Sequence, residues 1–146
     1  ALVDAAAAAV VASGAYVQAQ GKQALARVVA ASVVGVPPEI MGIGPVAAIP
    51  KALQQAGIAQ HQLDWIELNE AFAPQVLAVL KGWGWDERDR LNVNGSGISL
   101  GHPIGATGAL ITVKALYELQ RVNGRYALVT MCIGGGQGIA AIFERM

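Results

Sequence analysis

Apolar residues occur in this chain in blocks whose length and side-chain shape differ. Blocks of four to ten residues that are bounded by glycine, proline or polar residues are typical of buried strands. Five blocks have this length: Ala5–Ser13, Arg27–Val34, Leu63–Leu68, Tyr126–Met131 and Ile139–Phe143. The first is continuously apolar, but its alanines also favour a helix, so the pattern leaves its type open.

Longer apolar and mixed segments between these blocks predict helices. The predicted helices begin between Val46 and Pro50 and end at Ala56, run from about Ala71 to Lys81, and span Ala106–Leu119. A single helical turn is expected over Tyr16–Gly21, where the glycine can end it. By contrast, Met41–Pro45 holds Gly42, Gly44 and Pro45, and is predicted to be a loop.

Strands that alternate with helices indicate an α/β architecture. We therefore predict a mixed sheet of about five strands with helices on both faces. The 146 residues are enough for one domain with its own core, and no linker or repeat divides them. Residues 1–146 are accordingly taken as one domain.

Composition narrows the class of protein. Hydrophobic residues make up 54% of the chain, charged residues 14%, and the net charge is zero, which argues against disorder. A neutral chain gives no reason to expect nucleic acid or a membrane as a partner. The single cysteine excludes an intrachain disulfide and a zinc-type ligand cluster, so no metal is expected. The N-terminus lacks a basic region before its apolar run, and nothing indicates secretion, so a cytoplasmic location is expected.

The stretch from Asn92 to Gly108 is the strongest candidate for chemistry. It places His102 among small residues, and Pro103 restricts the backbone of the histidine before it. A neutral imidazole can accept a proton at physiological pH, and a stiff backbone with little bulk around it suits a base. The other histidine, His61, lies in a polar segment and is expected on the surface.

Two further stretches carry candidate groups. Cys132 ends an apolar block and opens onto a glycine-rich loop whose backbone N–H groups could hold an oxyanion. The residue pattern leaves open whether Cys132 is a nucleophile, a proton shuttle or an inert buried thiol. Asn69 follows a predicted strand, where it could orient a water or cap the next helix. Its neighbour Glu70 could be a base or a structural carboxylate.

The glycine-rich loops do not match either common nucleotide-binding motif. No G-x-x-x-x-G-K-[ST] occurs, and no G-x-G-x-x-G stands between a strand and a helix with an acidic residue at the expected distance. We therefore do not expect nucleotide binding of either type.

Taken together and in this order, these stretches resemble the thiolase family. Asn-Glu-Ala-Phe (69–72), Gly-His-Pro (101–103) and Cys-x-Gly (132–134) match the three C-terminal signatures of that family. The resemblance covers nearly the whole chain, but only the C-terminal domain of a thiolase, which is normally longer and has two similar α/β halves.

The resemblance implies a function and roles for individual residues. Thiolases interconvert a 3-ketoacyl-CoA plus CoA with two acyl-CoAs through an acyl-cysteine. His102 would activate the nucleophilic cysteine and, with a water held by Asn69, stabilise an enolate oxygen. Cys132 would be the acid/base, and the backbone N–H of Gly134 would form part of a second oxyanion hole. Ala71 and Phe72 would line the pantetheine channel.

The resemblance also implies partners. Coenzyme A thioesters would be substrates with no further cofactor, and a homo-oligomer is expected. The nucleophilic cysteine of the family lies in an N-terminal half, and this chain has no second cysteine. We therefore expect the nucleophile from an N-terminal half, in the same polypeptide or as a separate chain.

Three other functions compete with this one. A ketoacyl-synthase relative would use two histidines, and Asn69 stands in one of the corresponding motifs. A non-catalytic thiolase-like domain that binds acyl-CoA or lipid would not need His102 and Cys132. A structural subunit that completes a partner's fold is compatible with the missing half.

Overall fold

The computed structural model describes residues 3–146 of the chain. Its α-helices are α1 (Gly14–Ala19), α2 (Gly44–Ala56), α3 (Ala73–Trp83), α4 (Gly97–Leu100) and α5 (Thr107–Arg121). Its strands are β1 (Ala26–Gly35), β2 (Trp65–Leu68), β3 (Tyr126–Ile133) and β4 (Gln137–Arg145). Three short 3-10 helices are η1 (Pro38–Ile43), η2 (Gln60–Gln62) and η3 (Arg88–Arg90).

The strands form one mixed sheet in the order β1-β4-β3-β2. β4 pairs antiparallel with both β1 and β3, and β2 pairs parallel with β3. The described residues thus contain four strands where the sequence predicted about five. Beyond β2, Leu91 forms only a single parallel bridge with Ile66.

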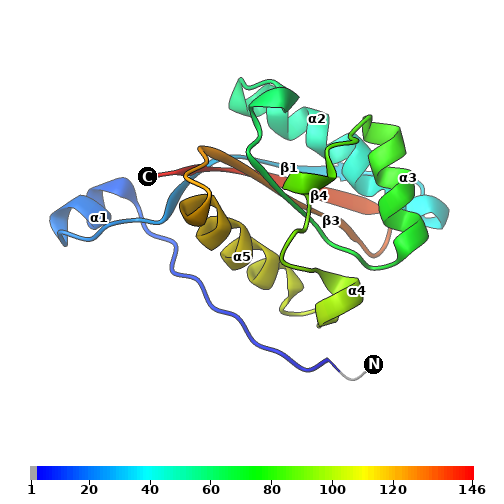
Figure 1. Cartoon of the computed structure of the whole chain (residues 1–146), viewed down its shortest axis with the longest axis horizontal. Helices are drawn as coiled ribbons and strands as arrows, with labels where there is room; N and C mark the ends of the chain where they lie inside the picture. The colour runs from blue at the N-terminus through cyan, green and yellow to red at the C-terminus, as the bar shows by residue number, and fades with distance from the viewer. Residues whose placement is uncertain (1–2) are drawn as a thin grey trace.

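The block Ala5–Ser13, predicted as either a strand or a helix, is neither. It has no regular secondary structure, and Figure 1 shows it as the dark blue trace that runs from α1 toward the N-terminus. Val10 is 94% exposed and Val11 87% exposed, so nothing within residues 3–146 buries them. Alanine side chains remove little apolar area from water, which leaves this block without a packing partner that would select one backbone conformation.

Helices cover both faces of the sheet, as predicted (Figure 1). α2 and α3 lie on one face and α5 lies on the other. The alternation of side chains along β2 separates the two cores: Ile66 and Leu68 pack with α2 and α3, whereas Trp65 packs with α5. All four residues of β2 are therefore buried.

The loop predicted for Met41–Pro45 is wrong. η1 occupies residues 38–43, and α2 begins at Gly44, two residues before the earliest predicted start. Pro45 stands in the first turn of α2, where a missing N–H costs no hydrogen bond. Gly57 ends this helix in a left-handed conformation, as its position after Ala56 predicted. The other predicted helices are confirmed with ends that differ by one to two residues.

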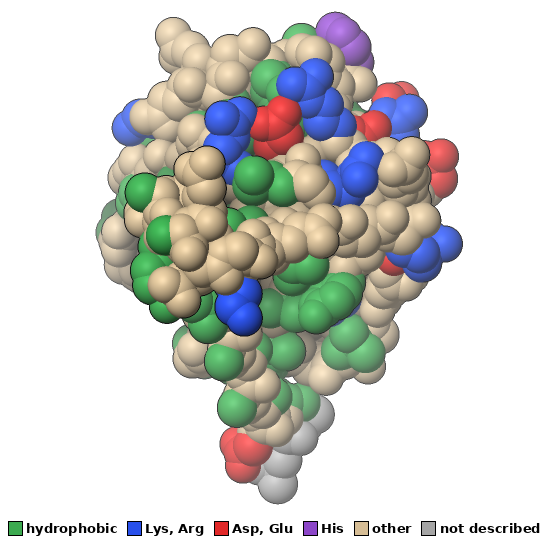
Figure 2. All heavy atoms as spheres, turned by 90° about the vertical axis from the view of Figure 1, so that its left-hand side faces the viewer, with side chains coloured by type: hydrophobic (Ala, Val, Ile, Leu, Met, Phe, Trp, Pro, Cys, Tyr) green, Lys and Arg blue, Asp and Glu red, His purple; other side chains and the backbone are tan. Residues whose placement is uncertain are grey.

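Charged side chains of both signs lie side by side on the face drawn in Figure 2. Glu144 near the end of β4 accepts from both Arg27 and Arg125, and its ion pair with Arg125 measures 2.8 Å.

No helix within residues 3–146 is long and apolar enough to cross a membrane.

Candidate active site

Asn69 follows β2 directly and is fully buried. Its backbone N–H donates to the carbonyl oxygen of Thr130 on β3 at 3.0 Å, so pairing with β3 fixes the backbone position of Asn69. The side-chain Nδ2 lies 3.3 Å from Nε2 of His102. The buried Oδ1 has no hydrogen-bond partner among residues 3–146. Such an acceptor is unusual, and it marks a place where water or a ligand can donate.

His102 lies between α4 and α5 and is half-buried. Its Nδ1 is 2.7 Å from Oγ1 of Thr107, the first residue of α5. It lines an open depression of about 650 Å³ together with residues 103–106 and residues 3–7. The structure thus brings together the two polar side chains, Asn69 and His102, that the sequence placed 33 residues apart.

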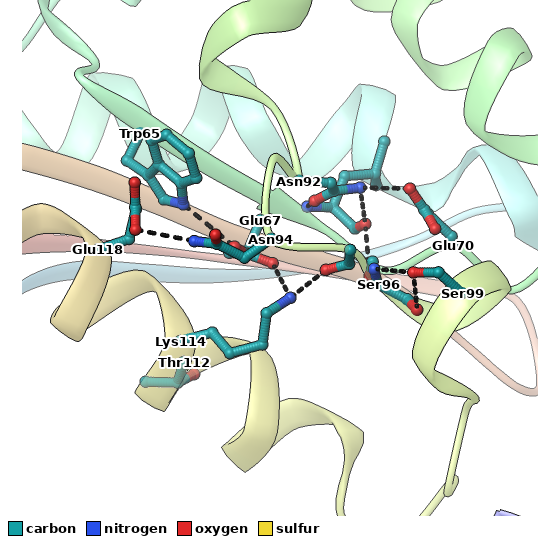
Figure 3. Close-up of polar contacts among 12 residues, drawn as sticks. Trp65, Glu67, Glu70, Asn92, Asn94, Ser96, Ser99, Thr112, Lys114 and Glu118 are labelled. Atoms are coloured by element: carbon teal, nitrogen blue, oxygen red, sulfur yellow. Dashed lines mark hydrogen bonds and ion pairs between the residues drawn. The ribbon is translucent and has the colours of Figure 1, made fainter.

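Asn92 links the end of β2 to the loop that leads to the histidine. Its side chain accepts from the backbone N–H of Leu68 at 2.9 Å and donates to the same residue's carbonyl at 2.8 Å. It also donates to Oε1 of Glu70 at 3.1 Å (Figure 3). Oε2 of Glu70 accepts from the backbone N–H of Ile98 at 3.2 Å. Of the two roles left open for Glu70, the contacts favour the structural carboxylate.

A second polar network ties β2 to α5. Glu67 is fully buried, and it accepts from Nε1 of Trp65 at 3.1 Å and from Nζ of Lys114 at 3.0 Å (Figure 3). Lys114 also donates to the carbonyl oxygen of Gly95. Burial raises the pKa of Glu67, while the contacts with Trp65 and Lys114 oppose that rise. Because β2 leads into Asn69 and α5 starts just after the histidine loop, this network helps to set their spacing.

We expect Lys114→Met to destabilise the fold by an amount that grows with pH. Without the lysine, the pKa of buried Glu67 rises further, while Glu67 in the unfolded chain titrates near its ordinary value. Above that ordinary pKa, Glu67 loses its proton readily in the unfolded chain but not in the folded variant. The free energy of unfolding of the variant therefore falls as pH rises. The loss should grow from about 1 kcal/mol near pH ~5 to about 3 kcal/mol near pH ~8 in urea unfolding.

The matched control is Lys51→Met, because Lys51 is exposed and donates only to the carbonyl oxygen of Val33 at 3.3 Å. Its effect should stay within about 0.5 kcal/mol at both pH values. An equal penalty for Lys114→Met at both pH values would contradict the assigned role of the Glu67–Lys114 pair.

Cys132 is buried near the end of β3, opposite Gly138 of β4. It lies two residues beyond Thr130, the residue whose carbonyl holds the backbone of Asn69. Burial raises the pKa of its thiol, so the thiol stays protonated at neutral pH. No hydrogen bond joins it to Asn69 or His102 within the described residues. A protonated thiol favours a proton donor over a resting thiolate nucleophile.

Gly134 and Phe72 occupy open positions, and Ala71 is half-buried. Gly134 lies in the turn between β3 and β4, and a Cβ added to it would meet no atom within 4 Å. Phe72 precedes α3 and is 69% exposed, and its carbonyl accepts from the backbone N–H of Val76 at 3.1 Å. None of the three lines the depression beside His102.

The sequence reasoning missed Thr107, Asn92 and the Glu67–Lys114 pair. Only Thr107 had a local signal, since it stands five residues after the histidine where a helix starts. His61 lies on the surface, as predicted. Residues 3–146 contain no group of three or more His, Cys, Asp or Glu side chains that could hold a metal ion.

Comparison with known proteins decides the family. A family model described as the C-terminal domain of thiolase matches residues 22–145. The chain belongs to the thiolase family. The thiolase fold also follows from solved structures: the human mitochondrial 3-ketoacyl-CoA thiolase superposes with a TM-score of 0.89 at 48% identity, over 92% of this chain and 34% of that protein. An acetyl-CoA acetyltransferase from Bacillus anthracis gives the same values.

Curated thiolases are similar to this domain over nearly all of its length. The beta-ketothiolase BktB of Cupriavidus necator is 63% identical over 99% of this chain. A 3-oxoadipyl-CoA/3-oxo-5,6-dehydrosuberyl-CoA thiolase of Escherichia coli is 52% identical over 98% of it. The chain spans 36% of the length of each of these two relatives.

Proposed function

We propose that this chain is the C-terminal part of an acyl-CoA C-acyltransferase. The enzyme would interconvert a 3-ketoacyl-CoA plus CoA with two acyl-CoAs, through an acyl-cysteine whose thiol comes from an N-terminal half. The observation that carries the proposal is the contact between Asn69 and Nε2 of His102 in a chain of the thiolase family. The unpartnered Oδ1 of Asn69 supports a water or ligand held at this point.

In the first half-reaction, His102 acts as the base. Its Nε2 takes the proton of the incoming cysteine, and the thiolate attacks the 3-keto carbon of the substrate. The bond between the 2- and 3-carbons then breaks, leaving an acyl-cysteine and an acyl-CoA enolate. His102 and a water held by Asn69 stabilise the enolate oxygen.

Cys132 supplies and later recovers a proton. Its protonated thiol, favoured by burial, protonates the 2-carbon of the enolate and releases the first acyl-CoA. The resulting thiolate takes the proton of CoA, whose sulfur attacks the acyl-cysteine. The second acyl-CoA leaves, and His102 returns its proton to the departing cysteine. Each proton is thus restored at the end of the cycle.

The open residues complete the proposed site. The backbone N–H of Gly134 helps to stabilise the oxyanion formed on the acyl group, and the free space around this glycine supports the approach of a thioester. Ala71 and Phe72 line the pantetheine channel. The 69% exposure of Phe72 leaves its ring accessible to a ligand or to another part of the protein.

The proposal includes an N-terminal half, in the same polypeptide or as a separate chain, and a homo-oligomer in the cytoplasm. No cofactor beyond the CoA thioester is needed for the steps above. Several large apolar side chains around the site are more than half exposed: Phe72, Ile98, Leu100 and Ile104. Such a surface supports burial against another protein surface. The single free thiol of Cys132 fits a reducing compartment.

Thiolysis of acetoacetyl-CoA tests the function. We expect a complete polypeptide that joins this domain to a nucleophile-bearing N-terminal half to cleave acetoacetyl-CoA in the presence of CoA. We expect this chain alone to show no cleavage, because it holds no thiol besides the buried Cys132. Loss of the thioester absorbance measures both rates.

Other outcomes would overturn the proposal. Robust cleavage by this chain alone would place the nucleophile within it. A complete polypeptide that binds acyl-CoA without turnover would favour a non-catalytic binding domain. A complete polypeptide with neither property would favour a structural subunit.

A further inference from the structure

Thr107 lies at the start of α5 and contacts Nδ1 of the imidazole, the ring nitrogen that Asn69 does not contact. It is 2% exposed, and its Oγ1 lies 2.7 Å from Nδ1 of His102. The same oxygen lies 2.9 Å from the carbonyl oxygen of Pro103. Because the helix begins at this residue, the backbone of α5 fixes where the hydroxyl points.

The hydrogen bonds of this hydroxyl determine which ring nitrogen of His102 carries the proton. A hydroxyl has one hydrogen, and the Pro103 carbonyl can only accept. The Thr107 O–H therefore donates to Pro103, and its Oγ1 can only accept from His102. Nδ1 of the imidazole then carries the hydrogen.

The contact on the other side of the ring fits the same proton position. Nδ2 of Asn69 carries only hydrogens, and it lies 3.3 Å from Nε2 of His102. With hydrogen on Nδ1, Nε2 presents a lone pair that can accept from this Nδ2. The Thr107 contact thus selects the tautomer with hydrogen on Nδ1 and none on Nε2, the atom that the proposed function uses as the base.

We infer that Thr107 is a positioning residue that keeps the proton of neutral His102 on Nδ1, so that Nε2 is free to accept a proton from the attacking thiol. This inference rests on the proposed function for its kinetic consequence, but the tautomer itself does not depend on any activity. A fixed tautomer matters because an imidazole with hydrogen on Nε2 cannot act as a base at that atom.

The kinetic experiment compares three variants in the complete polypeptide. Thr107→Val removes the hydroxyl and keeps the shape, and it should lower kcat for thiolysis by about 10- to 100-fold with KM within about 2-fold. Thr107→Ser restores the acceptor and should recover kcat to within about 3-fold of the original. Thr112→Val is the matched control, because its hydroxyl makes the same contact to the carbonyl four residues earlier, at 2.8 Å, and touches no histidine.

A direct measurement reads the tautomer in the 146-residue chain. Two-bond proton–nitrogen NMR spectra of the histidine-labelled chain, with His61→Gln to leave one imidazole, distinguish hydrogen on Nδ1 from hydrogen on Nε2. We expect the Nδ1–H pattern in the parent and in Thr112→Val, and a shift toward Nε2–H in Thr107→Val. Where Thr107→Val fails to fold, Thr107→Ala serves in both measurements.

Several results would contradict the positioning role of Thr107. An Nε2–H pattern in the parent, or an unchanged pattern and unchanged kcat in Thr107→Val, would overturn it. Equal losses of kcat in Thr107→Val and Thr112→Val would show a general effect on α5 and also overturn it. A parent enzyme without thiolysis would instead count against the proposed function, while the NMR pattern would still decide the tautomer.

Discussion

Replacing His102 with alanine is expected to lower kcat for thiolysis by about 1,000-fold or more in the complete polypeptide, with KM changed by less than about 3-fold. The reason is that the imidazole supplies both the base for the attacking thiol and a donor to the enolate oxygen. Such a loss corresponds to about 4 kcal/mol of transition-state stabilisation. Steady-state cleavage of acetoacetyl-CoA measures both constants.

The control for this substitution is His61→Ala. His61 lies exposed in η2 and has no contact with the site, so its removal should leave kcat within about 2-fold. Turnover that is unchanged in His102→Ala would rule out the histidine as a base and favour an acyl-CoA-binding domain. A raised KM with unchanged kcat would assign His102 to substrate binding instead.

Replacing Gly138 with alanine is expected to cost the fold about 3 kcal/mol or more. A Cβ at this position in β4 would stand 2.2 Å from the carbonyl carbon and oxygen of Gly44, at the start of α2. Both are backbone atoms, so rotation of a side chain cannot relieve the clash. The helix would have to move off the sheet and expose part of the core it shares with β3 and β4. Urea unfolding followed by circular dichroism measures the loss.

Gly35→Ala is the matched control for Gly138→Ala. Gly35 lies on β1, where it pairs with Gln137, and a Cβ there would meet no atom within 4 Å. Its stability should change by less than about 0.5 kcal/mol. A Gly138→Ala variant as stable as the Gly35→Ala variant would show that α2 and β4 do not pack as closely as the backbone places them.

The sequence alone predicted the elements whose signals are local. Runs of β-branched residues predicted β1, and the length and residue types of residues 106–119 predicted α5. These predictions hold because backbone preference and burial favour the same structure there. The opposite case is Ala5–Ser13, whose small side chains gain little from any packing, so neither predicted type formed. Gly44 and Pro45 read locally as a loop, although packing against β4 makes them the start of a helix.

The candidate site was likewise predictable only in part from the sequence. His102, Asn69 and Cys132 were recognisable from their motifs, because each stands in an unusual local context of glycine, proline or a strand end. The positions of these residues relative to one another and to their neighbours could not be predicted from the motifs. Parallel pairing of β2 with β3 sets Asn69 beside Thr130, and the start of α5 sets Thr107 on the histidine ring. These contacts depend on distances between segments far apart in sequence.

What the sequence by itself determined is therefore the family, the α/β class and the identity of the candidate chemical groups, since these are written in residue types and their spacing. Only the tertiary structure placed Thr107 against the ring of His102, joined Glu70 to the backbone of Ile98 and buried Cys132, which raises the pKa of its thiol. The physical reason is that a proton's position and a group's desolvation are set by neighbours in space, and those neighbours come from strands and helices that the chain order does not place side by side.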